Sequence, residues 1–287
     1  MEEKNDFQVL RSIPIFENTF GDDLRPNGRA AGEFLKPKLC TDILTHAFSS
    51  TMIDLGGTRI VCAVNVKATS DVKPNFHAYI SVEMSPASGR LLSVDNSRIY
   101  TEYLHTLIED ILRNLDEEKR HVFDEKTKAI VGSYQFFVDL VVLKDDGCIL
   151  DVAVLCAIHA LKNCVWPKLI LDSEGEFTNS VQTLDLKEVE MLVYVSFIIV
   201  PRSDEENSCM RPEVIAQPSI RECYMWDVDG PASFILLNSK GQVLDMQFLN
   251  NFGCNLLSSL SNCHGDLQSD MVKIACKYLE SAKKEWK

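Results

Sequence analysis

The sequence predicts an α+β protein with two β-α halves, in which strands come first and helices follow, twice. Strand patterns rich in β-branched residues lead into an amphipathic helix, and strands followed by helices return after the polar segment 171–190. Strands grouped before helices are typical of α+β proteins rather than of a doubly wound α/β sheet. The expected organisation is an N-terminal arm, 1–23, a first half, 24–187, and a second half, 188–287.

The first half begins with strands and a tight turn. Residues 50–68 are apolar and β-branched on both sides of Gly56-Gly57, which predicts two antiparallel strands joined by a turn. A third strand is expected at 75–84. A helix is expected over 99–115, where these apolar residues recur at helical spacing: Leu104, Leu107, Ile108, Ile111, Leu112 and Leu115.

The middle of the chain changes from strand to helix, and the second half repeats the order. A buried strand should end at Leu143, with a turn at 145–147, a helix from about Asp151 to Asn163, and Pro167 closing the unit. The later elements are expected as strands near 192–200, 222–226, 232–238 and 242–248, a hairpin at 239–241, and helices after Phe252 and from about Leu267. Segment 209–222, polar with two prolines, is interpreted as a mobile surface loop.

Composition limits the classes of partner. The formal net charge of −13 means that the chain as a whole repels RNA, so any RNA contact needs a local patch or basic neighbours. Ten cysteines scattered through apolar segments are interpreted as reduced core thiols. No apolar run approaches the roughly 18 residues that a membrane span needs, so we expect a soluble intracellular protein without membrane contact.

Metal and histidine chemistry are weakly indicated. The nearest arrangement to a metal site is Cys254 with Cys263-His264, which lacks a fourth ligand nearby. His159 lies in an apolar helical pattern and is interpreted as a core histidine rather than a base.

The segment Gly56-Gly57-Thr58-Arg59 allows two interpretations. Its glycines, hydroxyl and guanidinium have the composition of a phosphate-binding loop. A connection between two strands, however, has no helix N-terminus behind the anion, and this favours a turn.

Three motifs, in this order, resemble the RNase PH-like protein family. They are RPNGRAAGEF at 25–34, LGGTRIVCAVNVKA at 55–68 and DDGCILDVAVLCAIHALKN at 145–163. The resemblance covers the chain from about Leu24 to the C-terminal helix. It implies the RNase PH fold, of the ribosomal protein S5 domain 2-like type. It also implies a six-member ring around an RNA channel, as in the eukaryotic exosome core, and is greatest to one non-catalytic type of ring subunit.

The resemblance also implies that the chemistry has been lost. Phosphorolytic members place Thr and Arg at the start of the mid-chain helix, where this chain has Ile149 and Leu150, followed by Asp151. The helix that carries arginines toward substrate has Glu109 and Asp110 on its polar side. No catalytic residue, cofactor or metal is therefore expected.

Two aspartates in the second half of the chain allow two interpretations. Asp227 and Asp229 are candidates for the acidic residues that active members need, or they belong to a solvated turn before Gly230-Pro231. Alignment of the following hairpin with the family favours the turn, because it places Trp226 and Ala232 at the acidic positions.

Four arginines are assigned by the resemblance. Arg90 and Arg98 lie in segment 85–98, which the resemblance implies to be a loop whose arginines contact RNA phosphates, so they are either channel contacts or ordinary arginines of an exposed loop. Arg25 and Arg29 are expected to be structural and to tie the arm to the body or to a neighbour.

The expected function is that of a structural, catalytically inactive ring subunit that forms part of the RNA channel for 3′-to-5′ processing and decay. The implied partners are other RNase PH-like subunits, S1/KH-domain cap proteins, an associated exoribonuclease and single-stranded RNA. The implied location is the nucleus, including the nucleolus, and the cytoplasm. Two alternatives remain: a phosphate-dependent 3′-to-5′ exoribonuclease with an atypical site, and a lone protein-binding adaptor.

Overall fold

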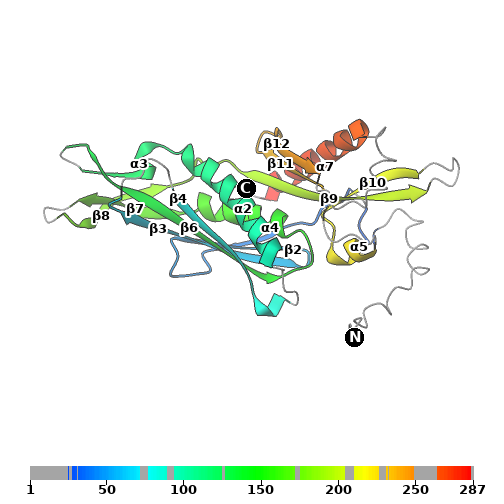
Figure 1. The fold of residues 1–287 in the computed structure, drawn as a ribbon, viewed down its shortest axis with the longest axis horizontal. Coiled ribbons are helices and arrows are strands. Elements are labelled where there is room, and N and C mark those ends of the chain that lie inside the picture. The colour runs from blue at the N-terminus through cyan, green and yellow to red at the C-terminus, as the bar shows by residue number, and fades with distance from the viewer. Residues whose placement is uncertain are drawn as a thin grey trace.

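The computed structural model describes residues 25, 28–30, 32–71, 77–88, 94–124, 127–171, 175–203, 210–225, 231, 233–248 and 264–285. Within these residues the chain forms two larger sheets, with one buried helix between them, and a separate two-stranded sheet (Figure 1). The expected N-terminal arm, 1–23, lies outside the described residues, as does 249–263, where a helix is expected after Phe252.

The first sheet contains six strands. Their bounds are Lys38–Thr41 (β1), Ser49–Leu55 (β2), Thr58–Thr69 (β3), His77–Met84 (β4), His121–Phe123 (β5) and Ile130–Lys144 (β6). Their order is β1-β2-β3-β6-β4, with β5 beside β6, and all neighbours are antiparallel except β4 and β6. Alternate β3 residues such as Ile60 and Cys62 are buried, while Val61 and Ala63 between them are half-buried, so only one face of this sheet is in the core.

Helices cover that core face. The helical segments here are Pro86–Ser88 (η3), Val94–Arg113 (α2), Glu117–Arg120 (α3) and Ile149–Lys162 (α4). Helix α2 packs against β4, and its buried Leu104, Ile108 and Leu112 form one stripe, as predicted. Helix α4 packs against β2 and β3 on one side and β9 on the other, which explains why it is apolar on almost every side.

The second sheet follows a hairpin of β7 (Val165–Leu171) and β8 (Phe177–Asp185). Its strands, in the order β10-β9-β11-β12, are Leu192–Ser203 (β9), Met210–Ala216 (β10), Ser233–Asn238 (β11) and Val243–Phe248 (β12). The helices are Ile220–Met225 (α5) and His264–Glu285 (α7). Helix α7 covers one face of this sheet through Met271, Ala275 and Tyr278, and it confirms the helix expected from about Leu267.

Segment 209–222 corrects the sequence prediction. Half of it, 210–216, is the edge strand β10, whose Val214 and Ile215 are buried against β9, so the segment is not a mobile loop. Pro212 is tolerated because a strand at the edge of a sheet needs no amide donor on its outer side. The expected strand at 222–226 is also wrong, because α5 occupies most of it.

Two further boundaries differ from expectation. The polar segment 171–190 contains β8, and Pro167 lies inside β7 instead of closing a unit. Helix α4 begins at Ile149, two residues before the expected start, and this shift decides which side chains occupy its N-terminus.

Candidate functional site

The Gly56-Gly57 segment is a turn between β2 and β3, as predicted. A side chain on Gly57 would meet the Cβ of Asp146 at 2.5 Å, so the close approach of these two segments requires glycine. The Thr58 hydroxyl is buried; it accepts a hydrogen bond from the Asp146 N–H at 2.9 Å and donates one to the Gly147 carbonyl. Arg59 forms an ion pair with Asp54 across the hairpin. The groups that resemble a phosphate loop therefore hold the 145–147 turn in place.

The N-terminus of α4 is the place where phosphorolytic relatives are expected to hold phosphate. Cys148 is its N-cap residue, in the left-handed conformation with φ of 55°, and provides no side-chain cap to the helix. Its thiol donates instead to the Pro218 carbonyl at 3.0 Å, and the Ser196 hydroxyl approaches the same sulfur at 3.7 Å. Burial raises the pKa of this thiol well above its usual value. The end of the helix is thus packed against the second sheet.

Asp151 lies buried in the first turn of α4. Its Oδ1 accepts the Ser196 N–H at 2.9 Å, whereas Oδ2 has no hydrogen-bond partner among the described residues. Burial raises the pKa of this carboxyl to about 7, and the bonds from Ser196 oppose the shift. An acid near a helix N-terminus interacts favourably with the helix dipole. The acidic group at the N-terminus of α4 is therefore the Asp151 carboxyl of the protein and not a bound anion.

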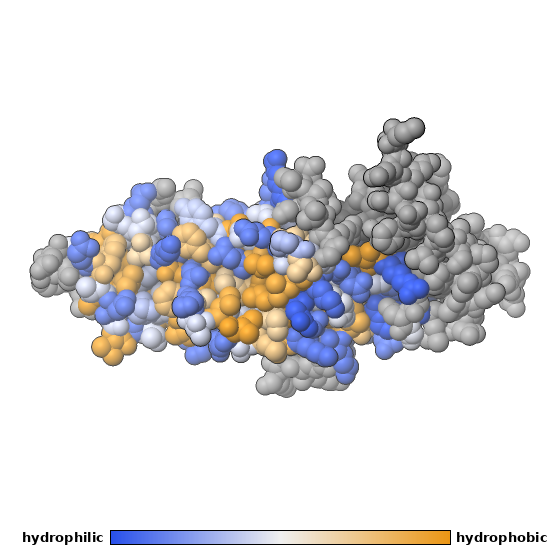
Figure 2. Space-filling view, turned by 90° about the horizontal axis from the view of Figure 1, so that it is seen from below, coloured by the Kyte–Doolittle hydropathy of each residue, from blue (hydrophilic) through white to orange (hydrophobic). Residues whose placement is uncertain are grey.

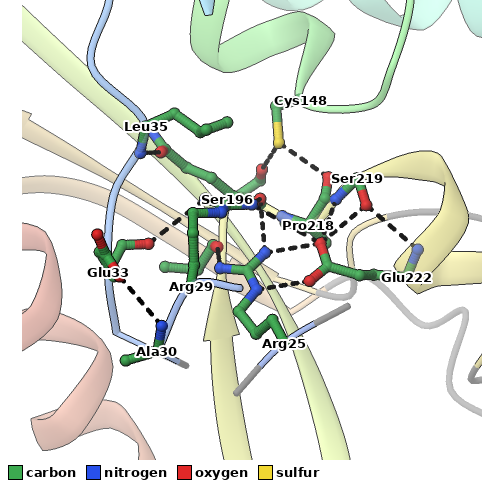
Figure 3. Close-up of polar contacts among 12 residues, drawn as sticks. Arg25, Arg29, Ala30, Glu33, Leu35, Cys148, Ser196, Pro218, Ser219 and Glu222 are labelled. Carbon is green, nitrogen blue, oxygen red and sulfur yellow. Dashed lines mark hydrogen bonds and ion pairs between the residues drawn. The ribbon is translucent and has the colours of Figure 1, made fainter. Parts of the chain in front are cut away.

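A buried arginine cluster lies beside this helix end and consists of Arg25, Arg29, Gln217, Ser219 and Glu222. Figure 3 shows Arg25, Arg29, Ser219 and Glu222 of this cluster. Arg25 and Glu222 form a two-point ion pair, Nε to Oε1 at 2.5 Å and Nη2 to Oε2 at 2.7 Å, with both side chains about 1% exposed. Arg25 also donates to the Ala216 carbonyl at 2.8 Å and to the Gln217 carbonyl at 3.0 Å. A bidentate pair with this many partners meets the condition under which a buried ion pair is tolerated.

Arg29 and Gln217 connect the rest of the cluster. Arg29 donates to the Gln217 carbonyl at 3.2 Å and lies 3.8 Å from Glu222. The Gln217 side-chain oxygen accepts the Leu35 N–H at 2.9 Å. Burial lowers the pKa of Arg29, and Arg25 lowers it further. Segment 25–35 is thereby attached to the second sheet, which confirms the structural role expected for Arg25 and Arg29.

Sequence reasoning missed Glu222, although a local signal was present. Ser219 and Glu222 form a capping box at the start of α5: the Glu222 N–H donates to the Ser219 hydroxyl at 3.3 Å, and the Ser219 N–H donates to Glu222 Oε2 at 2.7 Å. That pattern predicts a helix start. No local pattern indicates the partner Arg25, which lies 197 positions away in the chain.

The other polar groups noted in the sequence, on α2 and α4, are an ion-paired set and a buried histidine. On α2, Arg113 lies 3.8 Å from Glu109 and 3.3 Å from Asp110, so its charge is offset by the two acids noted in the sequence. His159 is buried, and its pKa falls to about 4 through burial and the nearby Lys162, which keeps it neutral at neutral pH, as expected of a core histidine.

The described residues show neither a cluster of metal ligands nor a membrane-spanning helix. They contain no group of three or more metal-ligating side chains, while Cys254, Cys263, Asp227 and Asp229 lie outside them. The seven described cysteines are free thiols, and five of them are buried. None of the helices in the described ranges is long and apolar enough to cross a membrane.

Comparison with known structures decides the fold. The chain matches a structure of the Archaeoglobus fulgidus exosome with RNA bound to the active site, with a TM-score of 0.66 at 20% identity, over 98% of this chain and 100% of the other. It also matches an archaeal exosome core with a TM-score of 0.63 at 20% identity, over 97% and 98% of the two chains. The chain has the RNase PH fold.

Sequence comparisons agree with the RNase PH fold. Residues 33–167 match the 3′ exoribonuclease family, domain 1. The exosome complex component Rrp42 of Archaeoglobus fulgidus is 23% identical over 189 residues, which are 64% of this chain and 71% of the relative. Rrp42 of Pyrobaculum aerophilum is 26% identical over 158 residues, which are 53% of this chain and 55% of the relative. The chain is thus similar to exosome core subunits of the Rrp42 kind.

The two arginines assigned to RNA differ in what the structure describes. Arg98 is exposed on α2 of the RNase PH fold, where its Nε forms an ion pair with Glu102 at 2.7 Å, and this hydrogen bond raises its pKa. Arg90 lies outside the described residues. Contact of either residue with RNA stays a prediction.

Proposed function

We propose that this chain is a structural, catalytically inactive subunit of an exosome ring of six RNase PH-like proteins. In this proposal it forms part of the RNA channel, and an associated nuclease performs 3′-to-5′ RNA processing and decay. One observation carries the loss of catalysis: the N-terminus of α4 is packed with the protein's own groups, Cys148 and Asp151, against Ser196 and Pro218.

The side chains at this helix end argue against phosphate binding. Ile149 is buried and Leu150 half-buried, so the positions expected to hold Thr and Arg in active relatives contribute apolar packing. A phosphate here would lie near the Asp151 carboxyl, and neither apolar side chain would donate a hydrogen bond to it. The nearby guanidinium groups of Arg25 and Arg29 are engaged with Glu222 and backbone carbonyls.

A ring subunit needs surfaces for two different neighbours. Strand β1 forms an end of the first sheet, and large apolar side chains of this region are 38 to 45% exposed: Leu39, Ile43, Leu44 and Phe48. Exposed apolar groups beside a sheet edge favour protein contacts. The face seen from below in Figure 2 also carries hydrophobic side chains near its middle. These features support an assembly role.

The finer assignments belong to the same proposal. The motifs favour a eukaryotic non-catalytic subunit of the ribosomal RNA-processing protein 43 type, acting in rRNA processing and mRNA turnover. Its partners would be other RNase PH-like subunits, S1/KH-domain cap proteins, an exoribonuclease and single-stranded RNA in the channel. The proposed locations are the nucleus, with the nucleolus, and the cytoplasm. The proposed division is an arm, 1–23, and halves 24–187 and 188–287.

The test is affinity purification of the tagged chain from native lysate, with all co-purifying proteins identified by mass. We expect several different RNase PH-like subunits together with RNA-binding cap proteins. Recovery of the chain without any RNase PH-like partner would overturn the ring assignment and support an independent adaptor. Phosphate-dependent release of nucleoside diphosphates by the chain alone would support the atypical exoribonuclease instead.

A further inference from the structure

The face of the first sheet that points away from α2 and α4 carries a row of three aligned side chains, here called the Tyr79 row. Strand registers place Asn65 of β3 opposite Phe137 of β6, and Phe137 opposite Tyr79 of β4. These residues lie on the half-buried or exposed side of their strands. Tyr79 is 47% exposed, although an exposed sheet face usually carries polar side chains.

The aromatic members of the row form an ordered stack. The Tyr79 and Phe137 ring centroids are 4.9 Å apart, and the ring planes differ by 12°. The Lys67 ammonium lies 4.9 Å from the Phe137 centroid. Because β6 lies between β3 and β4, Lys67 and Tyr79 approach Phe137 from opposite sides. Phe137 is therefore enclosed between a cation and a ring.

Tyr79 is the outermost member of this stack. Strand β4 is an edge strand of the first sheet within the described ranges, so the ring face that Tyr79 turns away from Phe137 is directed toward the sheet edge. A flat aromatic group placed there would continue the stack. The exposed Lys67 supplies positive charge beside the rings.

Polar side chains of the outer face surround the rings. Asn65 shares the row, and Gln135 lies opposite Lys67 in the next pair of the register. On the other side, Ser81 donates to Asp139 at 2.7 Å. This hydrogen bond engages one oxygen of the nearest acid, and Lys67 lies on the opposite side of the row from that acid.

We propose that Tyr79 is a stacking position for a nucleobase of single-stranded RNA, with Lys67 beside an adjacent phosphate. Base stacking on sheet aromatics combined with a nearby cation is a general mode of single-strand binding. The cation in the stack favours an anionic ligand over an apolar protein surface. The inference rests on the proposed function only for the choice of RNA as the ligand. The arrangement of Lys67, Phe137 and Tyr79 is described without assuming that the chain belongs to a ring or lines a channel.

The experiment uses the full chain and the purified assembly that contains it, with short oligouridylate carrying a photoreactive uridine. Mass analysis of the crosslinked peptides should identify the peptide that contains 77–84. In fluorescence anisotropy, Tyr79→Ala should weaken binding by roughly five- to hundredfold, the range for loss of one stacked base. Tyr79→Phe should bind nearly as wild type. Lys67→Gln should reduce the steepness of the plot of log K against log salt concentration by about one, because one phosphate contact is lost.

The matched control is Leu244→Ala, because Leu244 is 53% exposed on β12 of the second sheet, away from the Tyr79 row, and should leave RNA binding unchanged. Unchanged binding by Tyr79→Ala, or crosslinks confined to other peptides, would overturn the proposal. Slower hydrogen exchange of 77–84 on assembly without RNA, or failure of Tyr79→Ala to join the assembly, would overturn it in favour of a protein contact. Failure of the wild-type chain to recover RNase PH-like partners would count against the proposed function alone.

Discussion

The N-terminal end of α4 and the outer face of the first sheet use charged and aromatic side chains in opposite ways. At the helix end, acids and arginines are buried and directed at one another, as in the pair of Arg25 and Glu222. On the sheet face, Lys67 and Tyr79 are exposed, and their interactions leave one side open to solvent. The first region contributes to stability through contacts within the protein, and the second is exposed to solvent.

The largest expected effect is on the buried arginine cluster. Glu222→Gln leaves the Arg25 guanidinium buried without a carboxylate, and such a loss costs about 3–5 kcal/mol. The free energy of unfolding from urea titration should fall by this amount. Glu102→Gln, which breaks the exposed pair with Arg98, is the matched control and should leave the urea midpoint unchanged. Equal effects of the two changes would contradict the comparison.

The next largest effect is the pH dependence of stability that the Asp151 carboxyl produces. Its folded-state pKa of about 7 lies above the ordinary 3.8, so the folded protein binds the proton more tightly than the unfolded chain. This carboxyl therefore contributes most to stability below pH 3.8, and its contribution falls by about 1.4 kcal/mol per pH unit as pH rises toward 7. Above pH 7 it stays constant.

Asp151→Asn isolates this effect because the amide keeps a hydrogen-bond acceptor for Ser196 and does not titrate. Unfolding free energies at pH 5 and pH 8 should show that the variant gains stability relative to wild type as pH rises. The pKa of Glu222 shifts in the opposite direction, because burial would raise it but Arg25 and Ser219 together lower it below its ordinary value. Its contribution to stability is therefore lost on acidification. Parallel pH profiles for wild type and Asp151→Asn would show that the Asp151 carboxyl is not perturbed.

The turn at Gly57 offers a smaller test. Gly57→Ala would place a methyl group 2.5 Å from the Cβ of Asp146 and should destabilise the fold by about 1–3 kcal/mol, the range for overpacking. Adding Asp146→Gly should restore part of the loss in thermal unfolding. Gly32→Ala is the control, because its new methyl would meet only Ile274, at 3.9 Å. A phosphate-dependent recovery of Gly57→Ala would revive the loop interpretation.

The smallest effect on stability is expected at the two arginines assigned to RNA. Replacing Arg90 and Arg98 by Ala should leave assembly intact and weaken RNA retention by the assembled core, measured by filter binding at two salt concentrations. Retention equal to wild type would reject the assignment. Lys240→Ala, which removes one positive charge from the β11–β12 hairpin, is the control and should not alter retention.

The local pattern predicted those elements whose periodicity is set by one buried face, such as the α2 stripe and the hairpin at Gly56-Gly57. It failed where burial is decided by a distant neighbour. Strand β10 was predicted as a loop because it contains Pro212 and charged residues, but an edge strand tolerates them and β9 buries other residues of the strand. The acid at 222 gave a capping signal, but its arginine partner comes from the other end of the chain. Stacking of Tyr79 on Phe137 needed the β4–β6 register.

The most direct test of the central claim is phosphorolysis by the purified chain, and by the assembly after its associated nuclease has been removed. Single-stranded RNA, Mg²⁺ and increasing inorganic phosphate are supplied, and nucleoside diphosphates are measured by mass, with an active RNase PH-like enzyme as the positive control. We predict that the chain releases none at any phosphate concentration. Release by the chain alone that rises with phosphate would contradict the account of α4.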